Sequence, residues 1–246
     1  MPYRTLAALP VYNEATHVMG VLDDALRYAP ELLVVDDGST DGTSELLSRR
    51  DDLYVITHRR NRGYGAALRS AFEFALRGRY EILVTIDCDG QHQPGRIPLF
   101  VETLGLGTGR EVDVVSGSRY LSRFPGDSRP PEDRRRINRL VTADLNRRLG
   151  LNLTDGFCGF KAYRVEALAG IEISETGYAM PLEFWVWAVE RGLRIVELPV
   201  PLIYLDEQRS FGGALDDADT RLSIYRRVLD RSLGGRPGLR GIPVPR

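Results

Sequence analysis

The stretch LVTIDCDGQHQPGRIP, residues 83–98, is an apolar run that ends in two aspartates. Alternate residues of an extended segment point to the same side, so we expect the carboxylates of Asp87 and Asp89 to face one point. Gln91 adds an amide oxygen two residues further on. Hard divalent cations prefer oxygen ligands. The stretch therefore predicts a buried strand whose carboxyl end carries either a cation site or a pair of solvated acids.

Similar apolar runs flank this strand and alternate with helical patterns. Further strands are predicted at 5–13, 31–39, 53–59 and 112–120, and helices at 15–28, 39–50, 63–76 and 97–106. Continuous apolar strands between helices indicate an α/β fold whose mostly parallel central sheet has helices on both faces. In such sheets ligands bind beyond the carboxyl ends of the strands.

Polar side chains gather at those predicted ends. They are Asn13 and Glu14, Asp36 and Asp37, Asn61 and Arg62, the Asp87–Gln91 stretch, and Arg119. Tyr12 is placed to stack on a nucleotide base. Asp36 and Asp37 are equally suited to accept hydrogen bonds from a base or ribose and to cap the turn that follows them.

The second half of the chain is less regular. Residues 122–136 are rich in proline and charge and predict a mobile loop, followed by a helix over 137–149. Pro199 and Pro201 predict an edge strand, and a second mobile segment follows over 206–217. The apolar residues Phe184, Trp185 and Trp187 predict a buried helix. The last helical pattern is basic, and we interpret its arginines as a solvated face; they are Arg221, Arg226, Arg227 and Arg231.

Composition excludes several classes of protein. The 33 basic and 34 acidic residues give a net charge of -1, which offers no support for nucleic-acid binding. Two cysteines, Cys88 and Cys158, build neither a disulfide framework nor a zinc site, and they suit a reducing cytoplasm. No apolar stretch approaches the roughly 20 residues that span a bilayer. A role at a membrane would therefore need an anchoring partner or a surface patch.

Six motifs in order carry a resemblance to a known family. They are LPVYNE (9–14), VVDDGSTDGT (34–43), NRGYGAALRSAF (61–72), TIDCDGQHQP (85–94), GSRY (117–120) and DGFCGFKAYR (155–164). The chain resembles the family-2 glycosyltransferases, which have the nucleotide-diphospho-sugar transferase (GT-A type) fold. Within them it is most similar to the dolichyl-phosphate mannose synthase and polyprenyl-phosphate glycosyltransferase group. One glycosyltransferase domain is then expected over 1–233, with a nucleotide-sugar half at about 1–120, an acceptor half at about 121–233, and a disordered tail at 234–246.

The resemblance implies roles for individual residues. The nucleotide site would comprise Pro10, Tyr12, Glu14, Asp36, Asp37 and Asp87, and Mg2+ or Mn2+ would be held by Asp87, Asp89 and Gln91. The phosphate and acceptor site would comprise Arg119, Arg134, Arg135, Arg136 and Arg209. The catalytic set would be Asp89, Asp155 and Arg119. His92 is expected to support the metal turn, and Cys158, which stands where the group usually has a hydroxyl residue, to pack in the interior.

The implied function is metal-dependent, inverting transfer of a sugar from GDP-mannose or a UDP-sugar to a polyprenyl or dolichyl phosphate, with mannose favoured. The protein would work in the cytoplasm or peripherally at the membrane's cytoplasmic face. Two alternatives stay open. The acceptor is a saccharide or other hydroxyl with Asp155 as its base, or the chain is a nucleotide-sugar-binding module without turnover.

Overall fold

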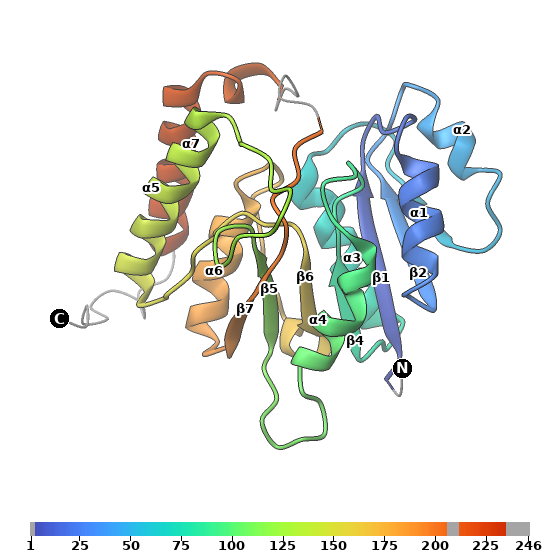
Figure 1. Cartoon of the computed structure of the whole chain (residues 1–246), viewed down its shortest axis with the longest axis horizontal. Coiled ribbons are helices and arrows are strands. Elements are labelled where there is room, and N and C mark those ends of the chain that lie inside the picture. The colour runs from blue at the N-terminus through green and yellow to red at the C-terminus, as the bar shows by residue number, and fades with distance from the viewer. Residues whose placement is uncertain (1–2, 206–211, 235–246) are drawn as a thin grey trace.

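The computed structural model describes residues 3–205 and 212–234, and a seven-stranded sheet forms its centre (Figure 1). Spatial order in the sheet is β3-β2-β1-β4-β6-β5-β7. The strands are β1 (Thr5–Val11), β2 (Glu31–Asp36), β3 (Tyr54–Thr57), β4 (Ile82–Thr85), β5 (Val114–Ser118), β6 (Lys161–Arg164) and β7 (Ile195–Pro199). Strand β7 lies at the edge of the sheet, as its prolines predict.

All neighbouring strands are parallel except β6, which runs antiparallel to β4 and β5. Lys161 at the start of β6 pairs with Thr85 near the end of β4 and with Ser116 of β5. The turn that precedes β6, residues 155–160, therefore lies at the same edge of the sheet as the carboxyl ends of the parallel strands. This one reversed strand brings the DGFCGF turn beside the aspartates that follow β4.

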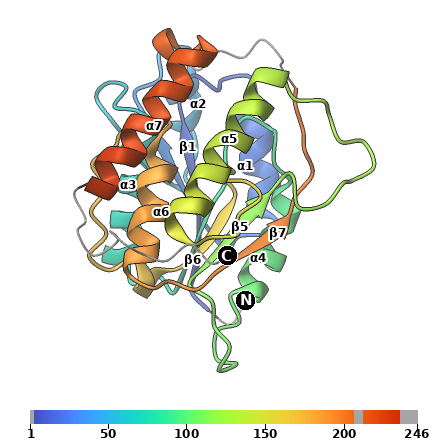
Figure 2. The same cartoon turned by 90° about the vertical axis from the view of Figure 1, so that its left-hand side faces the viewer.

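Helices cover both faces of the sheet, which confirms the predicted layers. One face packs against α1 (Val18–Leu26), α2 (Thr43–Leu47) and α4 (Ile97–Thr103). The other packs against α3 (Tyr64–Arg77), α5 (Glu132–Leu149), α6 (Met180–Glu190) and α7 (Ala218–Gly234). Figure 2 shows α5, α6 and α7 side by side on that second face. Phe184, Trp185 and Trp187 of α6 are buried there, as predicted.

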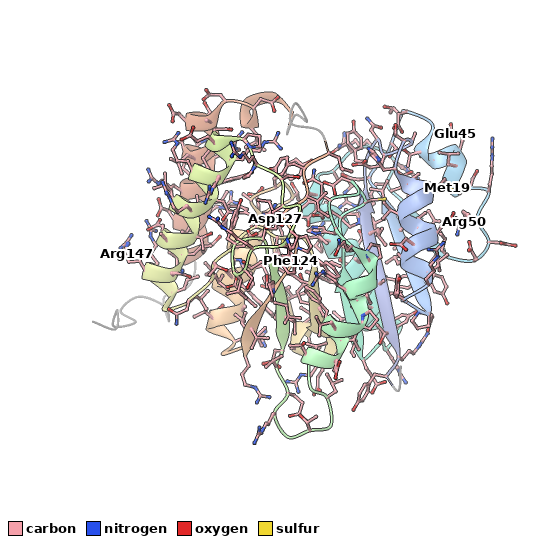
Figure 3. All side chains as sticks on the ribbon, in the orientation of Figure 1. Met19, Glu45, Arg50, Phe124, Asp127 and Arg147 are labelled. Carbon is pink, nitrogen blue, oxygen red and sulfur yellow. The ribbon has the colours of Figure 1, made fainter. Side chains whose placement is uncertain are left out.

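The region predicted as a mobile loop over 122–136 differs from the expectation in two ways. Helix α5 already begins at Glu132, because Pro131 precedes it and two acidic residues favour its first turn. The preceding loop is also bonded to the chain beyond β7. Asp127 accepts hydrogen bonds from the backbone N–H groups of Phe124 (2.8 Å) and Leu202 (2.9 Å). Figure 3 labels the side chains of Asp127 and Phe124 in this loop.

Within residues 3–205 and 212–234, no helix is long and apolar enough to cross a bilayer. Arg209 and the first half of the predicted second mobile segment, residues 206–211, lie outside the described residues, as does the tail after Gly234.

Candidate active site

A cavity of about 440 Å³ lies at the carboxyl edge of the sheet. Its walls come from the ends of β1, β2, β4 and β5 and from α3, α5 and α7. Most of the predicted site residues meet there; they are Pro10, Tyr12, Glu14, Asp37, Asp87, Asp89, Gln91, Arg119 and Arg134. Asp36, Asp155, Arg135 and Arg136 are outside this lining. The placement of polar residues at strand ends thus produces one site.

The turn after β4 brings both predicted acids to the cavity. Asp87, Cys88 and Asp89 all contribute to its lining, and Cys88, which is 2% exposed, also packs in the hydrophobic core on the side of α1 and α4. Gly90 has φ +73°, a conformation that favours glycine. This bend lets the backbone N–H of Gln91 donate to Asp89 Oδ1 at 3.0 Å. The two carboxylates are therefore presented to the same space.

Three residues contact the Asp87 carboxylate: Tyr64, His92 and Gly159. The Tyr64 hydroxyl donates to Oδ1 at 3.0 Å, and His92 Nε2 lies 3.3 Å from Oδ2. A Cβ at Gly159 would approach Oδ2 to 2.1 Å, so only glycine fits against this acid. Burial opposes ionisation, but the contacts with His92 and Tyr64 hold the pKa of Asp87 below its usual value. Asp87 is thus an oriented carboxylate, and His92 supports it as expected.

The oxygen donors at this turn fit a hard divalent cation. In the part of the chain that the structure describes, no group of three His, Cys, Asp or Glu side chains is arranged to hold a metal ion. A cation here would take the two carboxylates of Asp87 and Asp89 and the amide oxygen of Gln91, with its other positions left for ligand oxygens. Such incomplete protein coordination is typical of Mg2+ at phosphate sites.

Asp36 and Asp37, which are adjacent, have different surroundings. Asp36 is fully buried, and its carboxylate accepts bonds from Ser39 N and Ser44 Oγ, so it caps the turn and lies away from the cavity. Asp37 accepts from Gly63 N at 2.7 Å and contacts His58, yet it lines the cavity. Of the two, only Asp37 contributes to the lining of the cavity.

Arg119 and Asp155 form a buried ion pair. Arg119 Nε donates to Asp155 Oδ2 at 2.7 Å and Nη2 donates to Oδ1 at 3.0 Å. Asn138 Nδ2 also donates to Oδ1, at 2.8 Å, and Asp155 is fully buried. Burial alone would raise the pKa of Asp155, but the charge and hydrogen bonds of Arg119 hold it well below its usual range.

This environment weighs against the alternative in which Asp155 is the base for a hydroxyl acceptor. A base needs access to the acceptor proton and a pKa near the working pH, and this carboxylate has neither. Its role in the structure is to orient the guanidinium of Arg119, whose other side lines the cavity. Two-pronged contact with a carboxylate is the geometry that best fixes a guanidinium.

Three of the arginines predicted for the phosphate and acceptor site lie on different faces of α5. Arg134 lines the cavity one turn before Asn138, and its guanidinium lies 5.8 Å from the centroid of the Tyr204 ring. Arg135 is exposed, and Arg136 forms a 3.5 Å ion pair with Asp219 at the surface. Arg134 is therefore the one positioned for a ligand in the cavity.

Arg221 was predicted on a solvated face, and this expectation is wrong. Its side chain is 3% exposed, lines the cavity, and donates to the carbonyl of Leu215 at 2.6 Å and to the carboxylate of Asp133. The other buried residues of α7 include Tyr225, Val228 and Leu229, which continue from Arg221 at helical spacing. That spacing is the sequence signal that would have identified Arg221.

The turn before β6 rests on a buried lysine. Lys161 Nζ donates to the carbonyl of Cys158 and lies 5.5 Å from the centroid of the Trp185 ring. Burial lowers the pKa of Lys161, and the nearby Cys158, Asp155 and Asp87 oppose this effect. Cys158 is fully buried, in keeping with its predicted packing role.

The family model for glycosyl transferase family 2 matches residues 7–171, more than half of the chain. The chain therefore belongs to this family and is a glycosyltransferase, as the motifs indicate. It is 34% identical over 229 residues to an undecaprenyl-phosphate mannosyltransferase of Micrococcus luteus, covering 87% of this chain and 90% of the relative. It is 32% identical over 247 residues to a polyprenol monophosphomannose synthase of Mycolicibacterium smegmatis, covering 94% and 91%.

Solved structures confirm the GT-A fold. A glucosyl-3-phosphoglycerate synthase from Mycobacterium tuberculosis, in complex with Mn2+, UDP and glucosyl-3-phosphoglycerate, has a TM-score of 0.68 at 21% identity, covering 98% of this chain and 82% of that one. A mannosyl-3-phosphoglycerate synthase from Rubrobacter xylanophilus has a TM-score of 0.68 at 21% identity, covering 99% and 79%.

Proposed function

We propose that this family-2 glycosyltransferase transfers mannose, with inversion, from a nucleoside-diphosphate sugar to a polyprenyl phosphate. The observation that carries the proposal is the separation of charge along the cavity. The strand ends of β1, β2 and β4 contribute acids, which are Glu14, Asp37, Asp87 and Asp89. The end of β5 and helices α5 and α7 contribute arginines, which are Arg119, Arg134 and Arg221. Figure 1 shows β1 and β2 on one side of the molecule and α5 and α7 on the other.

The acidic end suits the donor. Tyr12 and Glu14 would face the base, and Asp37 lies close to them in the same wall. Asp87, Asp89 and Gln91 would hold Mg2+ or Mn2+, which when bound offsets the charge that grows on the diphosphate leaving group. Mn2+ and UDP in the solved glucosyl-3-phosphoglycerate synthase support this part of the proposal. The preference for mannose rests on the printed names of the two relatives, both of which are mannose-transferring enzymes.

The cationic end suits an acceptor that is already an anion. Guanidinium groups match phosphate oxygens in two-pronged geometry, and Arg119 is held ready for such contact by Asp155. A phosphate oxygen needs no base before it attacks the anomeric carbon. One nucleophile then displaces the diphosphate directly from the opposite face, and the configuration inverts. The relatives' acceptors, undecaprenyl phosphate and a polyprenol monophosphate, agree with this chemistry.

A hydroxyl acceptor, by contrast, would require a base near the arginines. Over residues 3–205 and 212–234, the carboxylates that line the cavity all lie at its acidic end, and Asp155 is enclosed by Arg119 and Asn138. The geometry thus favours the phosphate acceptor. Because that acceptor is a membrane lipid, we place the protein at the cytoplasmic face of a membrane, held there by a partner or by its own surface.

A panel of donors and acceptors tests the proposal. Purified protein with Mg2+ or Mn2+ would be given GDP-mannose, UDP-glucose or UDP-N-acetylglucosamine, each with a polyprenyl phosphate or with free sugars. We expect transfer of mannose to the polyprenyl phosphate. Asp89→Ala should lower the rate at least 100-fold, the scale for losing charge stabilisation in a transition state. Asp51→Ala, at an exposed acid away from the cavity, is the matched control.

Two results would contradict the proposal. Faster transfer to free sugars than to polyprenyl phosphate would point to the hydroxyl acceptor. Equal binding of nucleotide sugar by the wild type and Asp89→Ala, with no turnover by either, would indicate a binding module.

A further inference from the structure

Tyr64 belongs to the motif NRGYGAALRSAF, for which the proposed function supplies no role. It is the first residue of α3, and its hydroxyl donates to Asp87 Oδ1 at 3.0 Å. Its ring stacks on Tyr178, with centroids 5.7 Å apart and an interplanar angle of 16°. Both tyrosines line the cavity. A side chain from α3, the helix that connects β3 to β4, thus reaches the acid that follows β4.

The backbone around Tyr64 is fixed by close contacts on both sides. A Cβ at Gly63 would lie 2.3 Å from the carbonyl oxygen of Thr176, and one at Gly65 would lie 2.5 Å from that of Glu175. The N–H of Ala66 also donates to Thr176 at 3.2 Å. Only glycines allow the start of α3 to press this tightly on residues 175–177. The position of the Tyr64 hydroxyl is therefore set by packing as well as by its own hydrogen bond.

We propose that Tyr64 is a positioning residue for Asp87. Its O–H occupies one carboxylate oxygen and His92 contacts the other, so the remaining lone pairs of Asp87 are directed into the cavity. In that orientation they meet a divalent cation on the diphosphate or the ribose of the donor. This inference rests on the proposed function, because it assigns Asp87 to a nucleoside-diphosphate site.

Nucleotide binding measured by calorimetry tests the inference without turnover. GDP and UDP would be titrated with and without Mn2+ into the wild type, Tyr64→Phe, Asp87→Asn and the double variant. Tyr64→Phe keeps the ring and removes only the hydroxyl. We expect it to weaken Mn2+-dependent binding about tenfold, the scale for one hydrogen bond to a charged group. In the Asp87→Asn background the same change should have little further effect, because it acts through Asp87.

Tyr80→Phe is the matched control, since the Tyr80 hydroxyl also donates to a carboxylate, that of Glu31. Glu31 is the first residue of β2 and so lies at the edge of the sheet opposite the cavity. Tyr80→Phe should leave nucleotide affinity unchanged, even if both tyrosine variants lower the melting temperature by losing a hydrogen bond. Additive losses in the Tyr64→Phe, Asp87→Asn double variant would overturn the inference and leave the proposed function standing. A wild type that binds neither nucleotide with Mn2+ would overturn both.

Discussion

Asp89 at the acidic end of the cavity and Asp155 near its cationic end are the same residue type at the same edge of one sheet. Asp89 is half-buried at a bend and lines the cavity. Asp155 is fully buried, and Arg119 and Asn138 occupy its oxygens. The difference shows that two aspartates at the same edge of one sheet can take different positions. One faces the cavity, and the other is occupied in orienting a neighbouring side chain.

The largest effect should come from removing the supporting acid. Asp155→Ala removes the fully buried member of the pair and leaves the partly buried guanidinium of Arg119 without its partner, and loss of one member of a buried pair costs about 3–5 kcal/mol. Chemical denaturation should show this loss of unfolding free energy, and transfer should fall with it. Asp144→Ala is the control, because this acid on α5 also forms ion pairs, but with two more exposed arginines, Arg147 and Arg148. Its cost should stay within about 1 kcal/mol.

Removal of divalent cations should act on the other end of the cavity. With a chelator present we expect transfer to fall about 100-fold or more, while the free energy of unfolding stays unchanged. Added Mg2+ or Mn2+ should restore the rate. Binding of a nucleoside without phosphates should be insensitive to the chelator, because the cation would serve the diphosphate. Full activity in chelator would refute the metal assignment of Asp89.

Arg134→Gln sharpens the comparison at the cationic end. Loss of one charge-assisted contact with the acceptor phosphate, about 1.5 kcal/mol or more, should raise the KM for polyprenyl phosphate about tenfold and leave donor affinity unchanged. Arg136→Gln, two residues away but paired with Asp219 at the surface, should change that KM less than twofold. Equal effects of the two variants would mean that general surface charge, and not the cavity, attracts the acceptor.

The smallest expected effect is on the free energy of unfolding at acidic pH. The pKa of Asp155 is lower in the folded protein than in the unfolded chain, where an aspartate titrates near 4. Its stabilising contribution is thus complete above about pH 4 and is lost as the pH falls further, at up to about 1.4 kcal/mol per pH unit. Denaturation between pH 5 and pH 3 should show a shallower decline for Asp155→Asn than for the wild type. Parallel declines would refute this account.

Much of the fold follows from local pattern. Apolar strands alternating with helices predict the parallel sheet, and the prolines of β7 predict its edge position. The cavity at the carboxyl edge was also predictable, because parallel strands deliver their end residues to one side. The position of Asp87 and Asp89 after β4 correctly indicates that both reach the cavity, although Cys88 between them also lines it.

The remaining features depend on contacts between distant segments. Asp155 is enclosed because antiparallel β6 brings its turn against Arg119, and Asn138 approaches from α5. Arg221 points inward because α7 packs against the first turn of α5, where it meets Asp133. Neither partner is near in sequence. The family resemblance therefore left Asp155 open as a candidate base, and the charge pattern of the last helix suggested a solvated face for Arg221. Tyr64 was overlooked because its motif marks only the start of a helix.

The buried ammonium of Lys161 has a practical consequence for chemical labelling. It is the chain's one lysine among 33 basic residues, and its Nζ is enclosed between the Cys158 carbonyl and the Trp185 ring. Amine-directed esters should therefore leave Lys161 unmodified in the folded protein. A label on Lys161 would appear only when the sheet opens, so the fraction of Lys161 that is labelled would count unfolded molecules directly.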